Sequence, residues 1–99
     1  MEMNVTKQGE SKIIAVEGRI DTTTAATFEK TLLQEMEGES SVRINLEKVV
    51  YVSSAGLRAF LNGQKTANKK KIEMSLFNVA ETVMEVFEMT GFIDILTVE

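Results

Sequence analysis

The sequence has neither cysteine nor histidine among its 99 residues. Without thiols the chain forms no disulfide and no thiolate metal site. Without imidazole it lacks the commonest general base near neutral pH and the commonest metal ligand in proteins. The acidic residues are scattered and show no calcium-loop spacing. We therefore expect no metal site and no cofactor.

Long apolar runs and excess positive charge are missing as well. A membrane-spanning helix needs roughly 20 apolar residues, and the runs here are only a few residues long. Residues 1–8 lack the apolar stretch of a signal peptide. The formal net charge of -4 argues against nucleic acid as a partner. The one basic run, 69–71, is expected to be a solvated helix end or loop. A cytoplasmic protein without membrane insertion is the expectation.

The length and composition fit a single domain over residues 1–99. A hydrophobic fraction of 43% is ordinary for a globular chain and is enough for one core. There is no proline, so glycines and small polar clusters mark the turns. A deep catalytic cleft between two domains is not expected at this size, and we expect a monomer.

The first half of the chain predicts a hairpin, a helix and a strand. Residues 3–8 and 12–17 are expected to pair through a turn at Gly9, with Gly18 ending the second strand. A helix is expected from about residue 23 to residue 36, capped by Asp21 or Thr22. Residues 42–46 read as a strand. Residues 49–52 either extend that strand or form a buried loop.

The second half predicts two further helices, each followed by a strand. A helix is expected to begin at Ser53-Ser54 and to end near residue 67 or 68, before a strand at residues 72–76. Residues 78–81 have capping-box spacing and introduce a third helix, which Gly91 ends. A last strand is expected at residues 93–98. The order β-β-α-β-α-β-α-β predicts an α/β fold, a mixed sheet of four to five strands with three helices packed on it.

The segment at residues 51–58, Tyr-Val-Ser-Ser-Ala-Gly-Leu-Arg, is the most informative stretch. A strand-like run meets two serines at the start of a helix, where unpaired backbone N–H groups and a partial positive charge favour an anion. A phosphate on a serine there would be tolerated without unfolding the domain and would change the surface charge. The alternative is that Ser53 and Ser54 serve only as helix caps.

Three segments resemble the STAS domain family. Residues 18–21, Gly-Arg-Ile-Asp, with Thr24-Ala25 and Phe28-Glu29, are similar to the start of the first STAS helix. Residues 45–58 resemble the family signature, in which a strand delivers a phospho-accepting serine to a helix N-terminus. Residues 86–92 resemble the last helix and its glycine stop. The matches occur in the right order and cover nearly the whole chain.

This resemblance implies an anti-sigma factor antagonist. Such a protein binds an anti-sigma factor that is also a serine kinase, and thereby releases a sigma factor for transcription. The kinase phosphorylates the antagonist, which dissociates, and a PP2C-type phosphatase resets it. By position the acceptor is Ser54. Many members carry Asp immediately before the acceptor, whereas this chain has Ser53, which makes Ser53 an alternative acceptor.

The expected contact face combines the loop before the first helix with the start of the second. Its expected partner-binding residues are Asp21, Thr22, Ser53, Ser54, Gly56, Leu57 and Arg58. Core packing is an equal alternative for Leu57, a capping role comes first for Asp21, and simple solvation comes first for Arg58, before pairing with a partner carboxylate.

Two other functions compete with this interpretation. The chain could be a STAS subunit of a lipid-transport or stress-signalling assembly, without serine modification. It could also be an enzyme, but it has no P-loop and no Gly-x-Gly-x-x-Gly stretch. Catalysis by Ser54 would need a lysine or carboxylate base, and nothing in the spacing supplies one. We therefore expect a binding protein and no enzyme.

Overall fold

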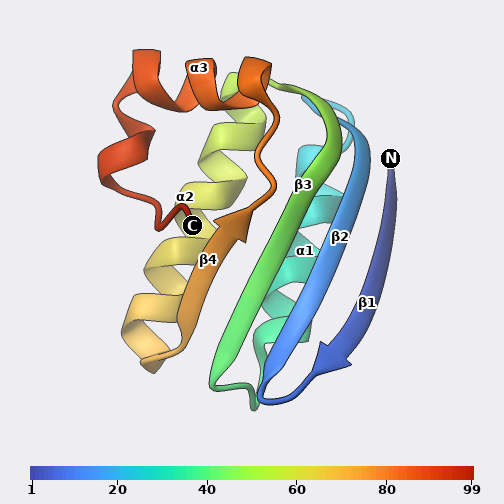
Figure 1. Cartoon of the computed structure of the whole chain (residues 1–99), viewed down its shortest axis with the longest axis vertical. Coiled ribbons are helices and arrows are strands. Elements are labelled where there is room, and N and C mark those ends of the chain that lie inside the picture. Colours follow the sequence, from blue (N-terminus) through green and yellow to red (C-terminus); the bar gives the residue numbers. More distant parts are fainter.

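The computed structural model describes all residues, 1–99, as strands and helices joined by short turns (Figure 1). The strands are β1 (Glu2–Gln8), β2 (Ser11–Ile20), β3 (Ser41–Val52) and β4 (Glu73–Phe77). The helices are α1 (Ala25–Met36), α2 (Ser54–Lys70) and α3 (Glu81–Thr90), and a 3₁₀ turn follows at Phe92–Asp94. No helix combines the length and the apolar character needed to cross a bilayer.

The strands form one mixed sheet in the order β1-β2-β3-β4. The β1–β2 hairpin is antiparallel and turns at Gly9, whose φ of +60° suits glycine. The pairs β2–β3 and β3–β4 are parallel, and their connections contain α1 and α2. Both helices lie behind the sheet in Figure 1, while α3 lies across the end where β3 and β4 finish. The predicted mixed sheet of four to five strands with three helices is confirmed, with four strands.

The strand β3 includes residues 49–52, which the sequence left as either strand or loop. Its pairing with β2 shifts register twice, because β3 carries an extra residue near Glu47 and another near Val50. The strand β2 also runs past Gly18, where the sequence predicted its end, as far as Ile20. The two strands therefore remain paired up to their last residues, directly before the loop and the helix start that the sequence singled out.

The last predicted strand is wrong. Residues 92–94 form the 3₁₀ turn, and only Val98 makes an isolated parallel bridge, to Leu76. Phe92 and Ile93 are half-buried against the core, so their apolar character reflects packing after the helix and no strand pairing. Gly91 ends α3 as predicted, with a φ of +80°.

Helix boundaries differ from the prediction at three places. The capping box at residues 78–81 is not formed: α3 begins at Glu81 after Ala80, and no side chain caps it. Asn78 instead adopts a left-handed turn with a φ of +53°. The helix α1 begins two residues after the predicted residue 23. The helix α2 continues to Lys70, whose charge is favourable beside the helix C-terminus.

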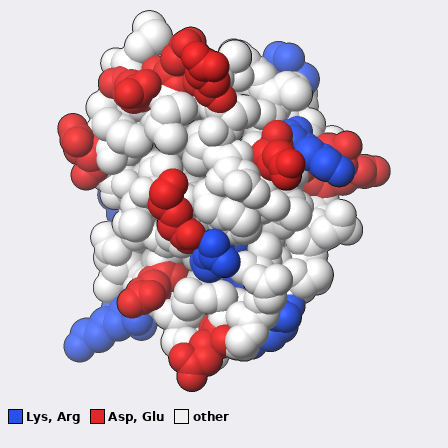
Figure 2. Space-filling view, viewed as in Figure 1, with Lys and Arg blue, Asp and Glu red and all other residues white.

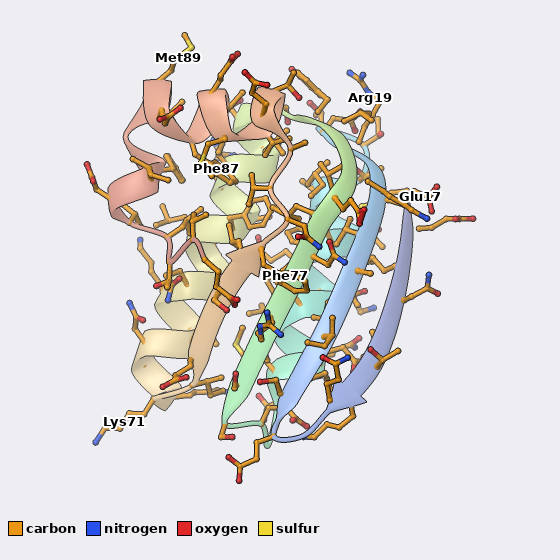
Figure 3. All side chains as sticks on the ribbon, in the orientation of Figure 1. Glu17, Arg19, Lys71, Phe77, Phe87 and Met89 are labelled. Atoms are coloured by element: carbon orange, nitrogen blue, oxygen red, sulfur yellow. The ribbon has the colours of Figure 1, made fainter.

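The core lies between the sheet and the helices, and each helix contributes one fully buried phenylalanine. The ring centroids of Phe28 and Phe60 are 5.0 Å apart, and those of Phe60 and Phe87 are 5.7 Å apart in an edge-to-face arrangement. Phe87 points inward from α3, whereas Met89 on the same helix points into solvent (Figure 3). Phe60 therefore links α1 and α3 through the middle helix.

On the helix-free face of the sheet, Glu99 is held by two strands. Its carboxylate accepts two hydrogen bonds from the Arg43 guanidinium, at 2.9 and 2.8 Å, and one from the Ser75 hydroxyl at 2.6 Å. Arg43 also lies 4.3 Å from the centre of the Phe77 ring. The Arg43 and Ser75 hydrogen bonds lower the pKa of Glu99 to about 2. These contacts hold residues 97–99 beside β4.

We predict that Phe60→Ala lowers the free energy of unfolding by about 3–5 kcal/mol, because it leaves a cavity where the three helices meet. Val50→Ala, at a side chain that is 64% exposed, should change it by less than about 0.5 kcal/mol. Urea denaturation of the three proteins measures both values. Equal losses in the two variants would contradict the assigned role of Phe60.

We predict that the stability supplied by Glu99 depends on pH. Its folded-state pKa of about 2 is below the ordinary value of 4.5, so the stabilisation is complete above pH 4.5 and is lost as the pH falls toward 2. The loss of stability on acidification should therefore be smaller in Glu99→Gln than in the wild type. Denaturation curves recorded across this interval measure the difference, and parallel pH profiles would refute the prediction.

Candidate functional site

The N-terminus of α2 packs directly on the end of β2. The Ser53 N–H donates to the Ile20 carbonyl oxygen at 2.9 Å. A Cβ at Gly56 would lie 2.6 Å from that same oxygen and 2.9 Å from a methyl carbon of Val52. Since no side chain fits there, glycine allows the helix to begin against the strand.

The two serines at this junction have different surroundings. Ser53 is the N-cap of α2, is half-buried, and its Oγ accepts the Gly56 N–H at 3.3 Å. Ser54 is the first residue of α2, is exposed, and its hydroxyl makes no hydrogen bond within the chain. Ser54 is therefore the more exposed of the two serines, and its hydroxyl is free of partners within the chain.

Asp21 organises the loop between β2 and α1. Its Oδ1 accepts the Thr23 N–H at 3.0 Å and the Thr23 hydroxyl at 2.7 Å, and its backbone carbonyl accepts the Ala25 N–H at 2.8 Å. The predicted helix cap is wrong: Thr24 is the N-cap of α1 and no side chain caps the helix, whereas Asp21 forms a turn just before it. Thr22 makes no such bond, and its side chain is exposed beside Asp21.

The pKa of Asp21 is lowered to about 2, first by the hydrogen bond from the Thr23 hydroxyl and then by the Thr23 backbone N–H. The Arg19 guanidinium contributes through a contact of 3.4 Å to Oδ2. Asp21 is therefore ionised at neutral pH, and its charge is matched by Arg19. Because Ile20 contacts Ser53, this paired charge lies at the same end of the sheet as the serines.

Two of the expected contact residues are buried: this contradicts the prediction for Gly56 and confirms the core-packing alternative for Leu57. Leu57 is 6% exposed and belongs to the hydrophobic core, and Gly56 is enclosed by Ile20 and Val52. Neither presents a side chain to a partner, so both support the surface from within. Arg58 is exposed, and it forms no ion pair within the chain.

Three exposed residues that the sequence did not single out as contacts lie beside the predicted contact face. The guanidinium carbon of Arg19 lies 4.4 Å from the centre of the Tyr51 ring, and both side chains are exposed. Val50, next to Tyr51, is exposed as well, because β3 carries its extra residue there. Strand alternation would place one of two adjacent residues inside, so only the register shift reveals that both face solvent.

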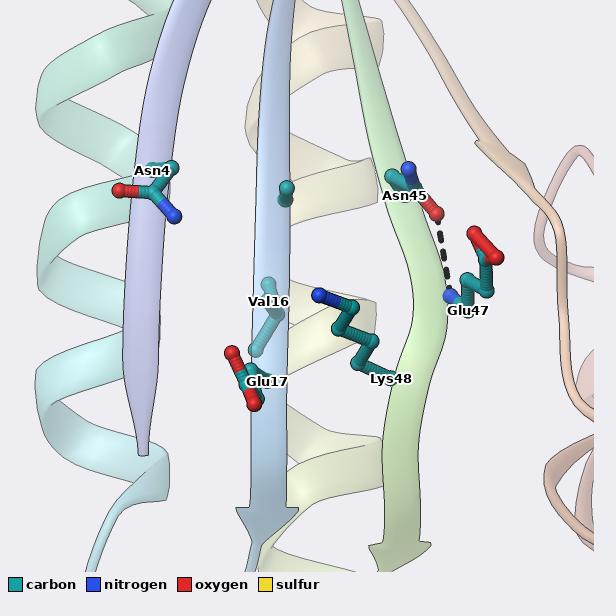
Figure 4. Close-up of a pocket in the computed structure, with 7 residues that line it drawn as sticks. Asn4, Val16, Glu17, Asn45, Glu47 and Lys48 are labelled. Atoms are coloured by element: carbon teal, nitrogen blue, oxygen red, sulfur yellow. Dashed lines mark hydrogen bonds between the residues drawn. The ribbon is translucent and has the colours of Figure 1, made fainter.

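A shallow hollow of about 260 Å³ lies elsewhere, on the helix-free face of the sheet (Figure 4). It is lined by Asn4, Ala15, Val16, Glu17, Asn45, Glu47 and Lys48. Asn45 Oδ1 accepts the Glu47 N–H at 3.0 Å where β3 bulges. None of the residues expected to bind a partner lines this hollow.

The helix α3 borders the same end of the sheet as Ser54 and is acidic. It carries Glu81, Glu85 and Glu88 and no lysine or arginine. Figure 2 shows acidic side chains at the top of the view, where α3 lies in Figure 1. No group of three or more acidic side chains is close enough to hold a metal ion.

The sequence matches the STAS domain family over residues 2–99. The chain belongs to the STAS domain family. This match agrees with the α/β fold predicted from the sequence pattern and with the family resemblance.

Two curated relatives align with nearly the whole STAS domain. The anti-sigma-B factor antagonist of Bacillus subtilis strain 168 is 32% identical over 100 residues, which cover 99% of this chain and 92% of that protein. The anti-sigma-B factor antagonist of Staphylococcus aureus strain NCTC 8325 / PS 47 is 29% identical over 101 residues, which cover 99% and 94%.

Among solved structures, the unphosphorylated anti-sigma factor antagonist SpoIIAA superimposes with a TM-score of 0.79. The match covers 99% of this chain and 88% of that one, at 16% sequence identity. At this identity the likeness concerns the fold, and it extends over the complete STAS domain.

We predict that Ser53→Ala lowers the free energy of unfolding by about 1 kcal/mol, because the Gly56 N–H loses its cap. Ser54→Ala should leave stability nearly unchanged, since the Ser54 hydroxyl has no partner in the chain. Chemical denaturation of the two variants measures the difference. The assignment of Ser53 as the cap would be wrong if Ser54→Ala were the more destabilised protein.

Proposed function

We propose that this STAS domain is an anti-sigma factor antagonist, which binds a kinase-type anti-sigma factor and is released from it by phosphorylation of Ser54. The names of the curated relatives support the antagonist role. The observation that carries the phosphorylation is the exposed, unbonded hydroxyl of Ser54 at the first residue of α2. In this role the chain acts by binding and is a substrate of the kinase.

The proposed contact region, called here the switch surface, consists of exposed and half-buried groups around the junction of β2, β3 and α2. From the predicted set it keeps Asp21, Thr22, Ser53, Ser54 and Arg58, and it adds Arg19, Val50 and Tyr51. Its composition suits protein recognition, because aromatic and arginine side chains are enriched where proteins bind one another. Gly56 and Leu57 position this surface from inside.

The modification is a phosphoryl transfer from ATP held by the kinase. The Ser54 oxygen attacks the γ-phosphorus and forms a new P–O bond, while the bond from that phosphorus to the β-phosphate oxygen breaks and ADP leaves. The hydroxyl proton passes to a base of the kinase. The phosphate then lies at the N-terminus of α2, where backbone N–H groups and the helix dipole favour an anion.

Phosphorylation is proposed to prevent binding by adding charge to the switch surface. The phosphate brings about -1.5 to -2 charges at neutral pH. A partner carboxylate about 5 Å away, at an effective dielectric constant near 20, would be repelled by roughly 3 kcal/mol per unit charge pair. Such a penalty weakens binding about a hundredfold. The exposed phosphate also remains accessible to a PP2C-type phosphatase, whose hydrolysis restores the serine.

The family resemblance leads us to expect Asp immediately before the acceptor, and the serine that stands there, Ser53, bears on the choice of acceptor. Ser53 could itself be phosphorylated, but the residue is half-buried and its hydroxyl caps α2. Modifying it would displace the cap from the Gly56 N–H. The geometry therefore favours Ser54, and the serine at position 53 preserves the cap that an Asp would also provide.

We predict that Ser54→Glu weakens binding to the kinase partner by about a hundredfold, because it places a carboxylate on the switch surface. Ser54→Ala should bind normally and resist modification. Titration calorimetry with the kinase measures binding, and mass spectrometry after incubation with ATP locates the phosphate.

Ser40→Glu is the matched control for this prediction. Ser40 is exposed and directly precedes β3. The substitution therefore adds the same charge at the end of β3 opposite to Ser54. Wild-type affinity in Ser54→Glu, or an equal loss in Ser40→Glu, would contradict the exclusion mechanism. Recovery of a transporter ATPase in place of a kinase would favour a STAS subunit of a transport assembly.

A further inference from the structure

The arginines of the chain differ in whether another side chain of the same protein already binds the guanidinium. Arg19 contacts the Asp21 carboxylate and the Tyr51 ring, and Arg43 binds Glu99 and lies over Phe77. Arg58 has neither a carboxylate nor an aromatic ring, and its side chain is exposed. It is therefore a free guanidinium on the switch surface.

Arg58 follows Ser54 by four residues on the same helix. Residues at this spacing are neighbours on one face of a helix, with Cβ atoms about 5–6 Å apart. An anion that precedes a cation by four residues is the favourable order, because it also agrees with the helix dipole. The long arginine side chain can span this separation, and its planar donors match a phosphate.

The backbone N–H groups at the start of α2 and the charges of the adjoining loop leave room for an anion at Ser54. The Ser53 Oγ takes the N–H of Gly56, and the Ser53 carbonyl accepts that of Leu57, while the N–H groups of Ser54 and Ala55 precede the first helical hydrogen bonds. Asp21, on the adjoining loop, is already matched by Arg19. Arg58 is thus the unmatched cation of α2 that lies one turn from a phosphate on Ser54, while the unpaired glutamates of α3 border the same end of the sheet.

We propose that Arg58 binds the phosphate on Ser54 within the same chain, an inference that rests on the proposed phosphorylation of Ser54. In the unmodified protein the Arg58 guanidinium is free to pair with a carboxylate of the partner. In the phosphorylated protein the phosphate occupies it. Modification then acts twice, because it adds a dianion to the switch surface and withdraws the cation that attracted an acidic group of the partner.

The test measures the second pKa of a phosphate placed on Ser54. Phosphoserine is incorporated at position 54 during translation, so no kinase is needed, and ³¹P NMR follows its ionisation. A free phosphoserine loses its second proton near pH 6. We expect this pKa to be about half a unit lower with Arg58 than in Arg58→Gln, the shift of a solvent-exposed ion pair. Arg58→Lys should recover part of the shift.

Lys65→Gln provides the control for net charge. Lys65 is exposed on the same helix but lies eleven residues from Ser54, which is about 16 Å along the axis. Its removal should leave the phosphate pKa unchanged, and circular dichroism verifies that each variant is folded. An identical phosphate pKa with and without Arg58, or an equal rise in Lys65→Gln, would overturn the proposal.

The outcome is independent of whether a kinase modifies Ser54. If the phosphate pKa responds to Arg58 but no kinase phosphorylates Ser54, the pairing stands and the proposed function fails. The opposite outcome is also possible: the kinase modifies Ser54 and binding is lost, but the phosphate pKa is the same with Arg58 and with Arg58→Gln. In that case exclusion by added charge stands and the pairing is wrong.

Discussion

The contact between the start of α2 and the end of β2 is the constraint on which the rest of the structure depends. The Ser53 N–H bonds to the Ile20 carbonyl oxygen, and Gly56 leaves no side chain between that oxygen and the helix. This contact brings two segments that are about thirty residues apart in sequence to one place. Without it, the Asp21 loop and the serines would not share a surface.

The same contact gives the adjacent serines different roles. Ser53 enters the helix as its cap and turns its hydroxyl toward the Gly56 N–H, while Ser54 begins the helix and faces solvent. A chemical change at Ser54 therefore alters the surface without breaking a bond of the fold. In the proposed mechanism, stability depends on Ser53 and regulation on Ser54, so the modification can be reversible without unfolding the domain.

Most of the fold could be predicted from local patterns. The hairpin around Gly9, the helices and the stop at Gly91 follow from periodicity and from glycine positions with positive φ. The pattern at residues 93–98 misled, because Phe92 and Ile93 are half-buried by packing after α3 and only Val98 pairs with β4. Apolar residues at a short spacing cannot reveal which neighbour buries them.

By itself, the sequence determined the order of elements as far as the third helix, the absence of cysteine and histidine chemistry, and a serine pair at a helix start, because these depend on residue type and local spacing. Only the tertiary structure decided that Gly56 and Leu57 are interior, that Val50 and Tyr51 are both outside, and that Arg58 has no partner. These properties arise from contacts and register shifts between strands and helices distant in sequence, which no local pattern records.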